Sequence, residues 1–334
     1  MQAFEQLEKE FGDFIGNPNT VAVSSGTSAL HIACEVARTY LTDDVTGAVQ
    51  PRIAVPEYTM VACPRAACMA DLKPVFVGCL DNLQMNMDLV PDDVDIVMAV
   101  HIYGNLCDTE YLHTLTGSMV IEDMAEVHGA RPHPNTFAAC WSFYKNKTIH
   151  GEEGGMIAFK NVKDANLAKQ LRTLGFDNNH DYYHVPRGVN ARMSNAHAEL
   201  ILPSLRDAQG SISHRHIISN CYDQHVPIEW QLPMCRFPWI YPLRIKGMNW
   251  QEQRELVDRF NDEGVAARQG FKSMLQQAEY HSAYSECITK AISLQHEVIY
   301  LPLSDTMTYA NAESIGHSLM RHAKIVIPKL TRIE

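Results

Sequence analysis

The sequence predicts an α/β protein in which helices cover both faces of a mainly parallel β-sheet, followed by a smaller α+β domain. Short, continuously apolar runs typical of buried parallel strands recur along the first half of the chain. Segments with helical spacing of apolar residues separate these runs. Beyond about residue 217 the pattern changes to a few strands among helices. We therefore expect a large domain over residues 1–213 and a small domain over residues 214–334.

The large domain begins with a predicted helix over residues 4–15, where apolar side chains recur at helical spacing before a Gly-Asn-Pro turn. A β-rich run over residues 21–23 then leads through a polar turn into a helix over residues 29–40. A later helix over residues 195–217 should bend or break at Pro203, because proline cannot donate a backbone hydrogen bond. Further strands are expected at residues 53–55, 74–77, 96–100, 119–121 and 156–159.

The C-terminal domain is predicted from four segments. Residues 240–245 and 298–301 have the apolar character of strands. Residues 250–261 and 311–322 have helical spacing.

Composition excludes several classes of protein. The chain has 334 residues, 46% of them hydrophobic and 20% charged, which is typical of a globular enzyme. A formal net charge of -11 argues against nucleic acids and anionic membranes as partners. No apolar run approaches the roughly 18 residues of a membrane span, and the N-terminus lacks a secretory signal. Nine cysteines without a CxxC pair indicate a reducing cytoplasm, with neither a disulfide framework nor a metal site.

Polar residues gather where the predicted parallel strands end, which is the edge at which such sheets bind ligands. Gly26-Thr27-Ser28 precedes a helix, so backbone amides and two hydroxyls form a candidate phosphate cradle. Asp123 follows an apolar strand, and a lysine within residues 145–147 follows another. Each feature alone is also explained by helix capping or by a solvated side chain. Their conjunction indicates a pyridoxal phosphate enzyme, in which lysine holds the aldehyde as a Schiff base and aspartate keeps the pyridine nitrogen protonated.

Six motifs follow one another in order along the chain. They are a GTxAL-like turn at residues 23–30, a P-x-aromatic-T segment at 56–60, HxYG at 101–104, an IEDAAQAHGA-like run at 121–130, SFxxxK with EGG at 142–155, and a GYNYRMSN-like run at 188–195. Together they resemble the pyridoxal-phosphate-dependent nucleotide-sugar aminotransferases of the DegT/DnrJ type. The resemblance covers most of the chain and implies the aspartate-aminotransferase-like fold type I, with a seven-stranded sheet in the large domain.

The resemblance implies roles for individual residues. The spacing to the EGG motif selects Lys147, and not Lys145, as the Schiff-base residue. Asp123 would bind the pyridine nitrogen, and Glu126 would lie beside the ring hydroxyl. Met60 takes the place of the aromatic ring that stacks on the cofactor in the family.

The phosphate of the cofactor would be anchored by Gly26, Thr27, Ser28 and Ser142. The resemblance assigns Asn190 to the phosphate in a neighbouring subunit, so we expect a homodimer with shared active sites. Three weaker candidates for substrate contacts are Tyr58, His150 and Arg268.

The implied activity is transfer of an amino group from glutamate or glutamine to the keto group of a nucleotide-linked keto-deoxysugar, with pyridoxamine phosphate as the intermediate. A keto-cyclitol or another ketone is an alternative acceptor. A sugar dehydratase is disfavoured because Lys147 stands where that branch has histidine. A non-catalytic homologue acting as a regulator or assembly subunit is disfavoured by the retained Asp123 and Lys147. A nicotinamide-binding protein would need the further glycines of GxGxxG after Gly26.

Overall fold

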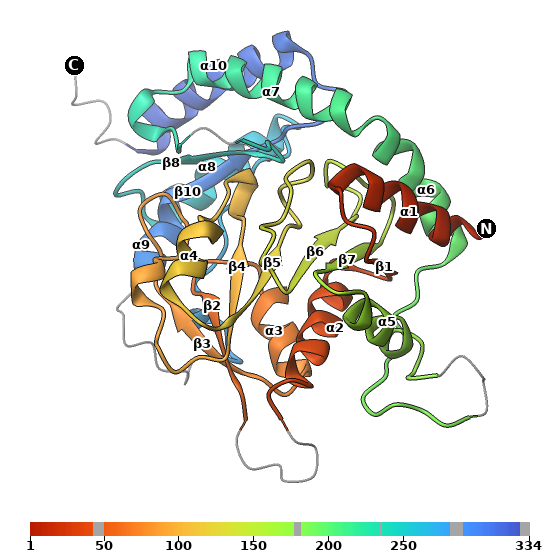
Figure 1. Ribbon diagram of the computed structural model, residues 1–334. Helices are drawn as coiled ribbons and strands as arrows, with labels where there is room; N and C mark the ends of the chain where they lie inside the picture. Colours follow the sequence, from red (N-terminus) through yellow and green to blue (C-terminus); the bar gives the residue numbers. More distant parts are fainter. Residues whose placement is uncertain (43–49, 177–181, 234–235, 281–289, 328–334) are drawn as a thin grey trace.

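A seven-stranded sheet forms the centre of the computed structural model, which describes residues 1–42, 50–176, 182–233, 236–280 and 290–327 (Figure 1). The strand order is β1-β7-β6-β5-β4-β2-β3. β7 is antiparallel to both of its neighbours, whereas β6, β5, β4, β2 and β3 pair in parallel, which confirms the predicted sheet. The strands are β1 (Thr20–Val23), β2 (Arg52–Pro56), β3 (Lys73–Val77), β4 (Ile96–Val100), β5 (Met119–Asp123), β6 (Ala138–Ser142) and β7 (Gly155–Phe159).

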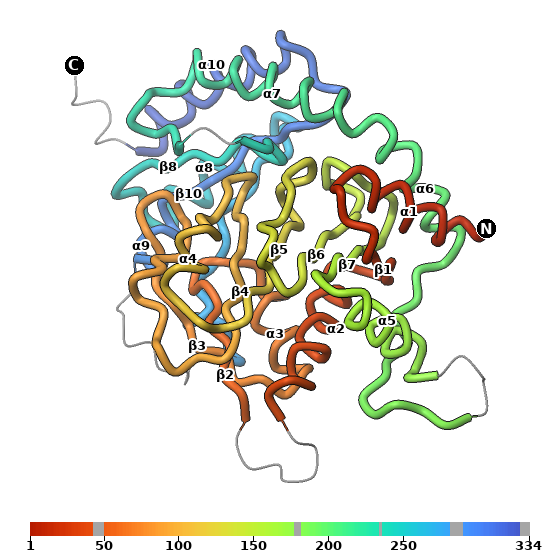
Figure 2. The backbone as a smooth tube through the Cα atoms, viewed as in Figure 1, coloured from red at the N-terminus to blue at the C-terminus, as the bar shows by residue number. Residues whose placement is uncertain are grey.

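Helices cover both faces of this sheet because its strands are apolar on both sides. In β1, Val21 and Val23 pack against one set of helices and Ala22 against the other. Figure 2 shows the N-terminal helix α1 beside α6, on the face opposite α2, α3 and α5. The helices are α1 (Ala3–Ile15), α2 (Gly26–Arg38), α3 (Ala62–Met69), α4 (Thr109–Leu115), α5 (Val162–Leu171) and α6 (Asn195–Arg206).

Among the helix boundaries that differ from the predictions are the start of α2 and the break within the predicted helix over residues 195–217. α2 begins at Gly26 rather than residue 29, because the Ser25 hydroxyl accepts the Ser28 amide at 3.1 Å and caps the helix. Pro203 lies inside α6, and the break comes at Asp207, which separates α6 from α7 (Ala208–His225). The chain therefore stays helical for one further turn after the proline.

The C-terminal part contains a three-stranded antiparallel sheet in the order β8-β10-β9. α7 and α10 lie side by side over it (Figure 1). The predicted boundary near residue 214 falls inside α7, between Ala208 in the core of the large sheet and Ile218 in a separate C-terminal core. The boundary itself stays a prediction. The elements are β8 (Tyr241–Arg244), β9 (Arg268–Gln269), β10 (Val298–Leu301), α8 (Trp250–Asp262), α9 (Lys290–Glu297) and α10 (Tyr309–Val326).

The part of the chain that the structure describes also contains four short 3-10 turns, namely η1 (Met87–Leu89), η2 (Ile102–Gly104), η3 (Ile228–Trp230) and η4 (Met274–Gln276). Within the described ranges, no helix has the length and apolar character needed to cross a membrane.

The junction between β7 and the start of α2 leaves no space for a side chain. A methyl group on Gly155 would lie 2.3 Å from the carbonyl oxygen of Ser25 and 2.9 Å from the amide nitrogen of Gly26. These are backbone atoms, so the chain itself would have to move. We expect Gly155→Ala to lower the free energy of unfolding by about 2 kcal/mol or more in urea titrations.

The matched control is Gly117→Ala, because nothing lies within 4 Å of the added methyl group. This substitution should change the free energy of unfolding by less than about 0.5 kcal/mol. Equal free energies of unfolding for the two variants would show that Gly155 does not pack closely against the backbone of Ser25 and Gly26.

Candidate active site

A cavity of about 410 Å³ opens where β1, β2, β4, β5 and β6 end. This volume lies within the usual range for sites that hold a cofactor or small ligand. Seven of the predicted residues line it, namely Gly26, Thr27, Met60, Asp123, Glu126, Ser142 and Lys147. The lining also includes Ser25, Thr59, His101, Trp239, Phe271 and Tyr300, which the sequence analysis did not assign.

The N-terminus of α2 forms one end of the cavity. A methyl group on Gly26 would lie 2.7 Å from the Ser142 Cβ, so glycine is needed for the close approach of these two segments. The partial positive charge of the helix terminus and the Thr27 and Ser142 hydroxyls suit an anion. The Ser28 hydroxyl instead lies 3.0 Å from the hydroxyls of both Ser24 and Ser25, and Ser28 is not among the cavity-lining residues.

Lys147 occupies the turn between β6 and β7 and is only 9% exposed. Its Nζ lies 3.5 Å from Glu126 Oε1 and 3.6 Å from the centre of the Trp239 ring. Burial lowers the pKa of Lys147, although the charges of Glu126 and Asp123 oppose this shift. A lowered pKa increases the fraction of neutral amine, which is the form that reacts with a carbonyl group.

Two carboxylates face the lysine from the end of β5 and the loop that follows it. Asp123 Oδ1 accepts the Ala125 amide at 3.0 Å, and Oδ2 accepts the Cys63 thiol at 3.2 Å. Burial, with the Asp123 charge, holds the pKa of Cys63 well above its usual range, so the thiol keeps its proton and donates it. Glu126 Oε2 accepts a hydrogen bond from the Tyr103 amide at 2.6 Å. Tyr103 makes this bond from a left-handed backbone conformation, with a φ of 52°. Burial raises the pKa of Glu126.

His101 presents its ring to the cavity in a fixed orientation. Its Nδ1 accepts the Cys107 amide at 2.9 Å, so Nε2 carries a proton and donates it to Glu122 Oε2 at 2.8 Å. Both ring nitrogens are therefore occupied. Two signals in the sequence marked this histidine, namely its position directly after the predicted strand over residues 96–100 and the HxYG motif at residues 101–104.

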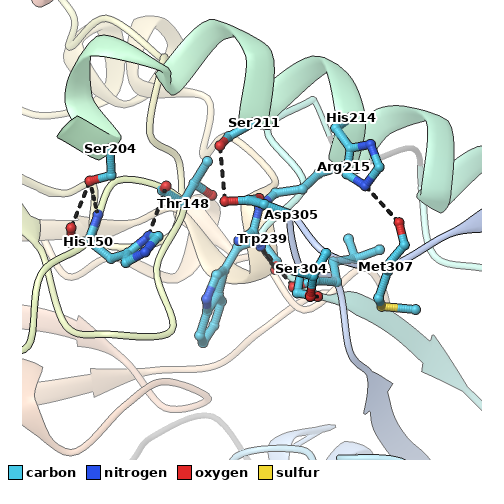
Figure 3. Close-up of polar contacts among 12 residues, drawn as sticks. Thr148, His150, Ser204, Ser211, His214, Arg215, Trp239, Ser304, Asp305 and Met307 are labelled. Carbon is cyan, nitrogen blue, oxygen red and sulfur yellow. Dashed lines mark hydrogen bonds and ion pairs between the residues drawn. The ribbon is translucent and has the colours of Figure 1, made fainter.

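Among the described residues, four others that the sequence predicted for the site do not line this cavity, namely Asn190, His150, Tyr58 and Arg268. Asn190 is exposed and lies in a separate surface groove. His150 turns toward α6, where its amide donates to the Ser204 hydroxyl at 2.9 Å (Figure 3). Tyr58 is fully buried, and Arg268 is exposed on β9. Their roles in binding stay predictions.

The chain matches the DegT/DnrJ/EryC1/StrS aminotransferase family over residues 2–320. It belongs to this family. The predictions of the family, of the fold class and of an aminotransferase are thereby confirmed.

Some relatives match along nearly the whole chain. GDP-perosamine synthase from Caulobacter vibrioides is 26% identical over 343 residues, which cover 93% of this chain and 87% of the relative. The dTDP-3-amino-3,6-dideoxy-alpha-D-galactopyranose transaminase from Aneurinibacillus thermoaerophilus is 24% identical over 351 residues, covering 95% and 89%. The aminotransferase PseC from Helicobacter pylori shares the fold, with a TM-score of 0.87, 17% identity and coverage of 97% and 92%.

His128 provides a pH test of the buried site. Its Nδ1 accepts the Ile149 amide at 2.7 Å, and burial, with the charges of Lys147 and Arg215, lowers the pKa of His128 to about 3. The unfolded chain therefore binds a proton near pH 6.5 that the folded protein does not bind until near pH 3, so stability falls as the pH drops through this window.

We expect His128→Asn to remove roughly 2 to 3 kcal/mol of the stability difference between pH 7 and pH 4.5. Urea unfolding of both proteins at the two pH values measures this difference. The same loss of stability in the wild type and the variant would show that His128 is not a buried neutral imidazole.

Proposed function

We propose that this protein is a pyridoxal-phosphate-dependent aminotransferase that moves an amino group from glutamate or glutamine to the keto group of a nucleotide-linked keto-deoxysugar. The observation that carries the proposal is the buried Lys147, which shares one cavity with Asp123 and the N-terminus of α2. The names of relatives support the acceptor class, because they include a GDP-linked and a dTDP-linked amino sugar.

The cavity fits pyridoxal phosphate. The N-terminus of α2 with the Thr27 and Ser142 hydroxyls would hold the phosphate, and Gly26 permits the close approach of the two segments that carry these hydroxyls. Asp123 would face the ring nitrogen, and Lys147 the aldehyde carbon. When bound, the cofactor serves as an electron sink for the negative charge that develops at the reacting carbon.

The protein's own residues prepare this chemistry. Hydrogen bonds from the Ala125 amide and the Cys63 thiol fix the Asp123 carboxylate, whose negative charge favours a proton on a ring nitrogen opposite it. Lys147 would supply the amine for the carbonyl group of the cofactor, and its free amine would be the base placed to take a proton from the donor α-carbon. Its lowered pKa suits both tasks.

The finer parts of the proposal concern assembly and location. A second copy of the chain would bring Asn190 to the phosphate, which agrees with its exposed position outside the cavity. The proposed assembly is therefore a homodimer, and the net charge of -11 favours small-molecule substrates over nucleic acids or anionic membranes as partners. The cysteines that the structure describes are free thiols, which supports a place in the reducing cytoplasm.

The absorption spectrum tests the proposed function. Wild-type protein with added pyridoxal phosphate should develop the visible absorbance of the bound cofactor, and L-glutamate should convert it to that of pyridoxamine phosphate. Lys147→Ala should show neither change because it lacks the reacting amine. Lys145→Ala is the matched control and should behave as the wild type, since Lys145 is exposed and does not line the cavity.

Each failure has a distinct meaning. Bound absorbance that glutamate leaves unchanged would refute the donor or the reaction class. Absence of any bound absorbance in the wild type would refute the proposed function.

A further inference from the structure

The indole ring of Trp239 lies directly over the reacting lysine. The Lys147 Nζ is 3.6 Å from the ring centre, and the indole Nε1 donates a hydrogen bond to the Asn146 carbonyl at 2.7 Å. Trp239 is 5% exposed and belongs to the cavity wall. One side chain therefore contacts two consecutive residues of the β6–β7 turn, attracting an ammonium group with its face and holding a carbonyl with its edge.

Trp239 is in turn fixed by a buried arginine on α7. Arg215 Nη1 donates to the carbonyls of Trp239 and Leu303, both at 2.9 Å. Its Nε donates to Asp305 Oδ1 at 2.9 Å, and the Ser211 hydroxyl donates to Asp305 Oδ2 at 3.0 Å (Figure 3). Arg215 is only 3% exposed, so its charge depends on these partners.

These contacts connect the lysine turn of the large sheet to the C-terminal part of the chain. Asp305 and Leu303 lie between β10 and α10, and Trp239 lies just before β8. The ring of Trp239 also packs near Tyr103 and Tyr300, at centroid distances of 6.5 and 6.4 Å. Separate elements thus hold the backbone carbonyl of Trp239 and its ring.

We propose that Trp239 is a positioning residue for Lys147, and that the Arg215–Asp305 pair keeps Trp239 in place. The inference rests on the proposed function, because the position of Lys147 matters only if Lys147 is the reacting amine. An aliphatic side chain would bury the lysine but would neither attract its ammonium form nor hold the Asn146 carbonyl.

The proposal is tested by titrating Lys147 in the full-length protein without cofactor. The rate at which acetic anhydride acetylates Lys147, followed by peptide mass spectrometry across pH, gives the midpoint of its titration. Trp239→Leu keeps an apolar side chain but removes the aromatic face, so the midpoint should fall by about one pH unit. Trp239→Phe keeps an aromatic face and should give a smaller fall.

The comparison isolates the tryptophan from its surroundings. The carboxylates of Asp123 and Glu126, the Cys63 thiol and the His128 ring also face Lys147, and none of them is altered in these variants. Trp230→Phe is the matched control, because Trp230 is similarly buried at 6% exposure but packs in the C-terminal core. It should leave the Lys147 midpoint unchanged.

Asp305→Asn tests the link to α7. Asp305→Asn should lower the Lys147 titration midpoint by less than Trp239→Leu does. In the Trp239→Leu background it should cause no further shift, because both substitutions act on Lys147 through the indole ring of Trp239. Additive shifts in the double variant would overturn the link through Asp305.

An unchanged or raised midpoint in Trp239→Leu would overturn the positioning role, even if its thermal stability falls. If the leucine variant does not fold, Trp239→Phe decides the question by the same criterion. Because the titration requires no cofactor, its failure is distinguishable from failure of the absorbance test of the proposed function.

Discussion

Burial of the Lys147 amine among the strand ends is the constraint on which the site depends. A lysine amine taken out of water is costly unless other groups compensate for the lost hydration. Glu126 at 3.5 Å and the face of Trp239 at 3.6 Å supply that compensation, and Asp123 adds a second negative charge. Burial still prevails in lowering the pKa of Lys147, which favours the neutral amine, the form that reacts with a carbonyl group, at the wall of the cavity.

The sheet makes this arrangement possible because parallel strands end at one edge. Residues that are distant in sequence, such as Ser25, Asp123 and Ser142, meet there without long connecting loops. The antiparallel β7 returns the chain after the lysine turn and pairs with β1 as well as β6. Gly155 at its first position then packs against the start of α2, so the turn that carries Lys147 and the helix whose N-terminus lines the cavity are fixed to each other.

The sequence predicted the parts of the site that local patterns encode. Apolar runs located the strands, and the polar residues that follow them, including Asp123 and Lys147, do line the cavity. His150 shows that a position close to Lys147 in the sequence does not suffice to place a residue in the cavity. Although it lies close to Lys147, its backbone turns away and bonds Ser204 on α6. Ser28 shows a second limit, since hydroxyls of its own turn compete for its side chain.

Trp239, Phe271 and Tyr300 could not be predicted in this way. They come from the C-terminal part and reach the cavity through packing between elements, for which no local spacing exists. The break after α6 was also misplaced, because Pro203 is tolerated within the helix and Asp207 ends it.

We propose that the buried Lys147 is the group that binds the cofactor. Borohydride reduction of the protein after incubation with pyridoxal phosphate, followed by peptide mass spectrometry, shows which lysine carries it. We expect the fixed pyridoxyl group on Lys147 and not on the exposed Lys145. Modification of Lys145 or of another surface lysine, with Lys147 unmodified, would contradict it.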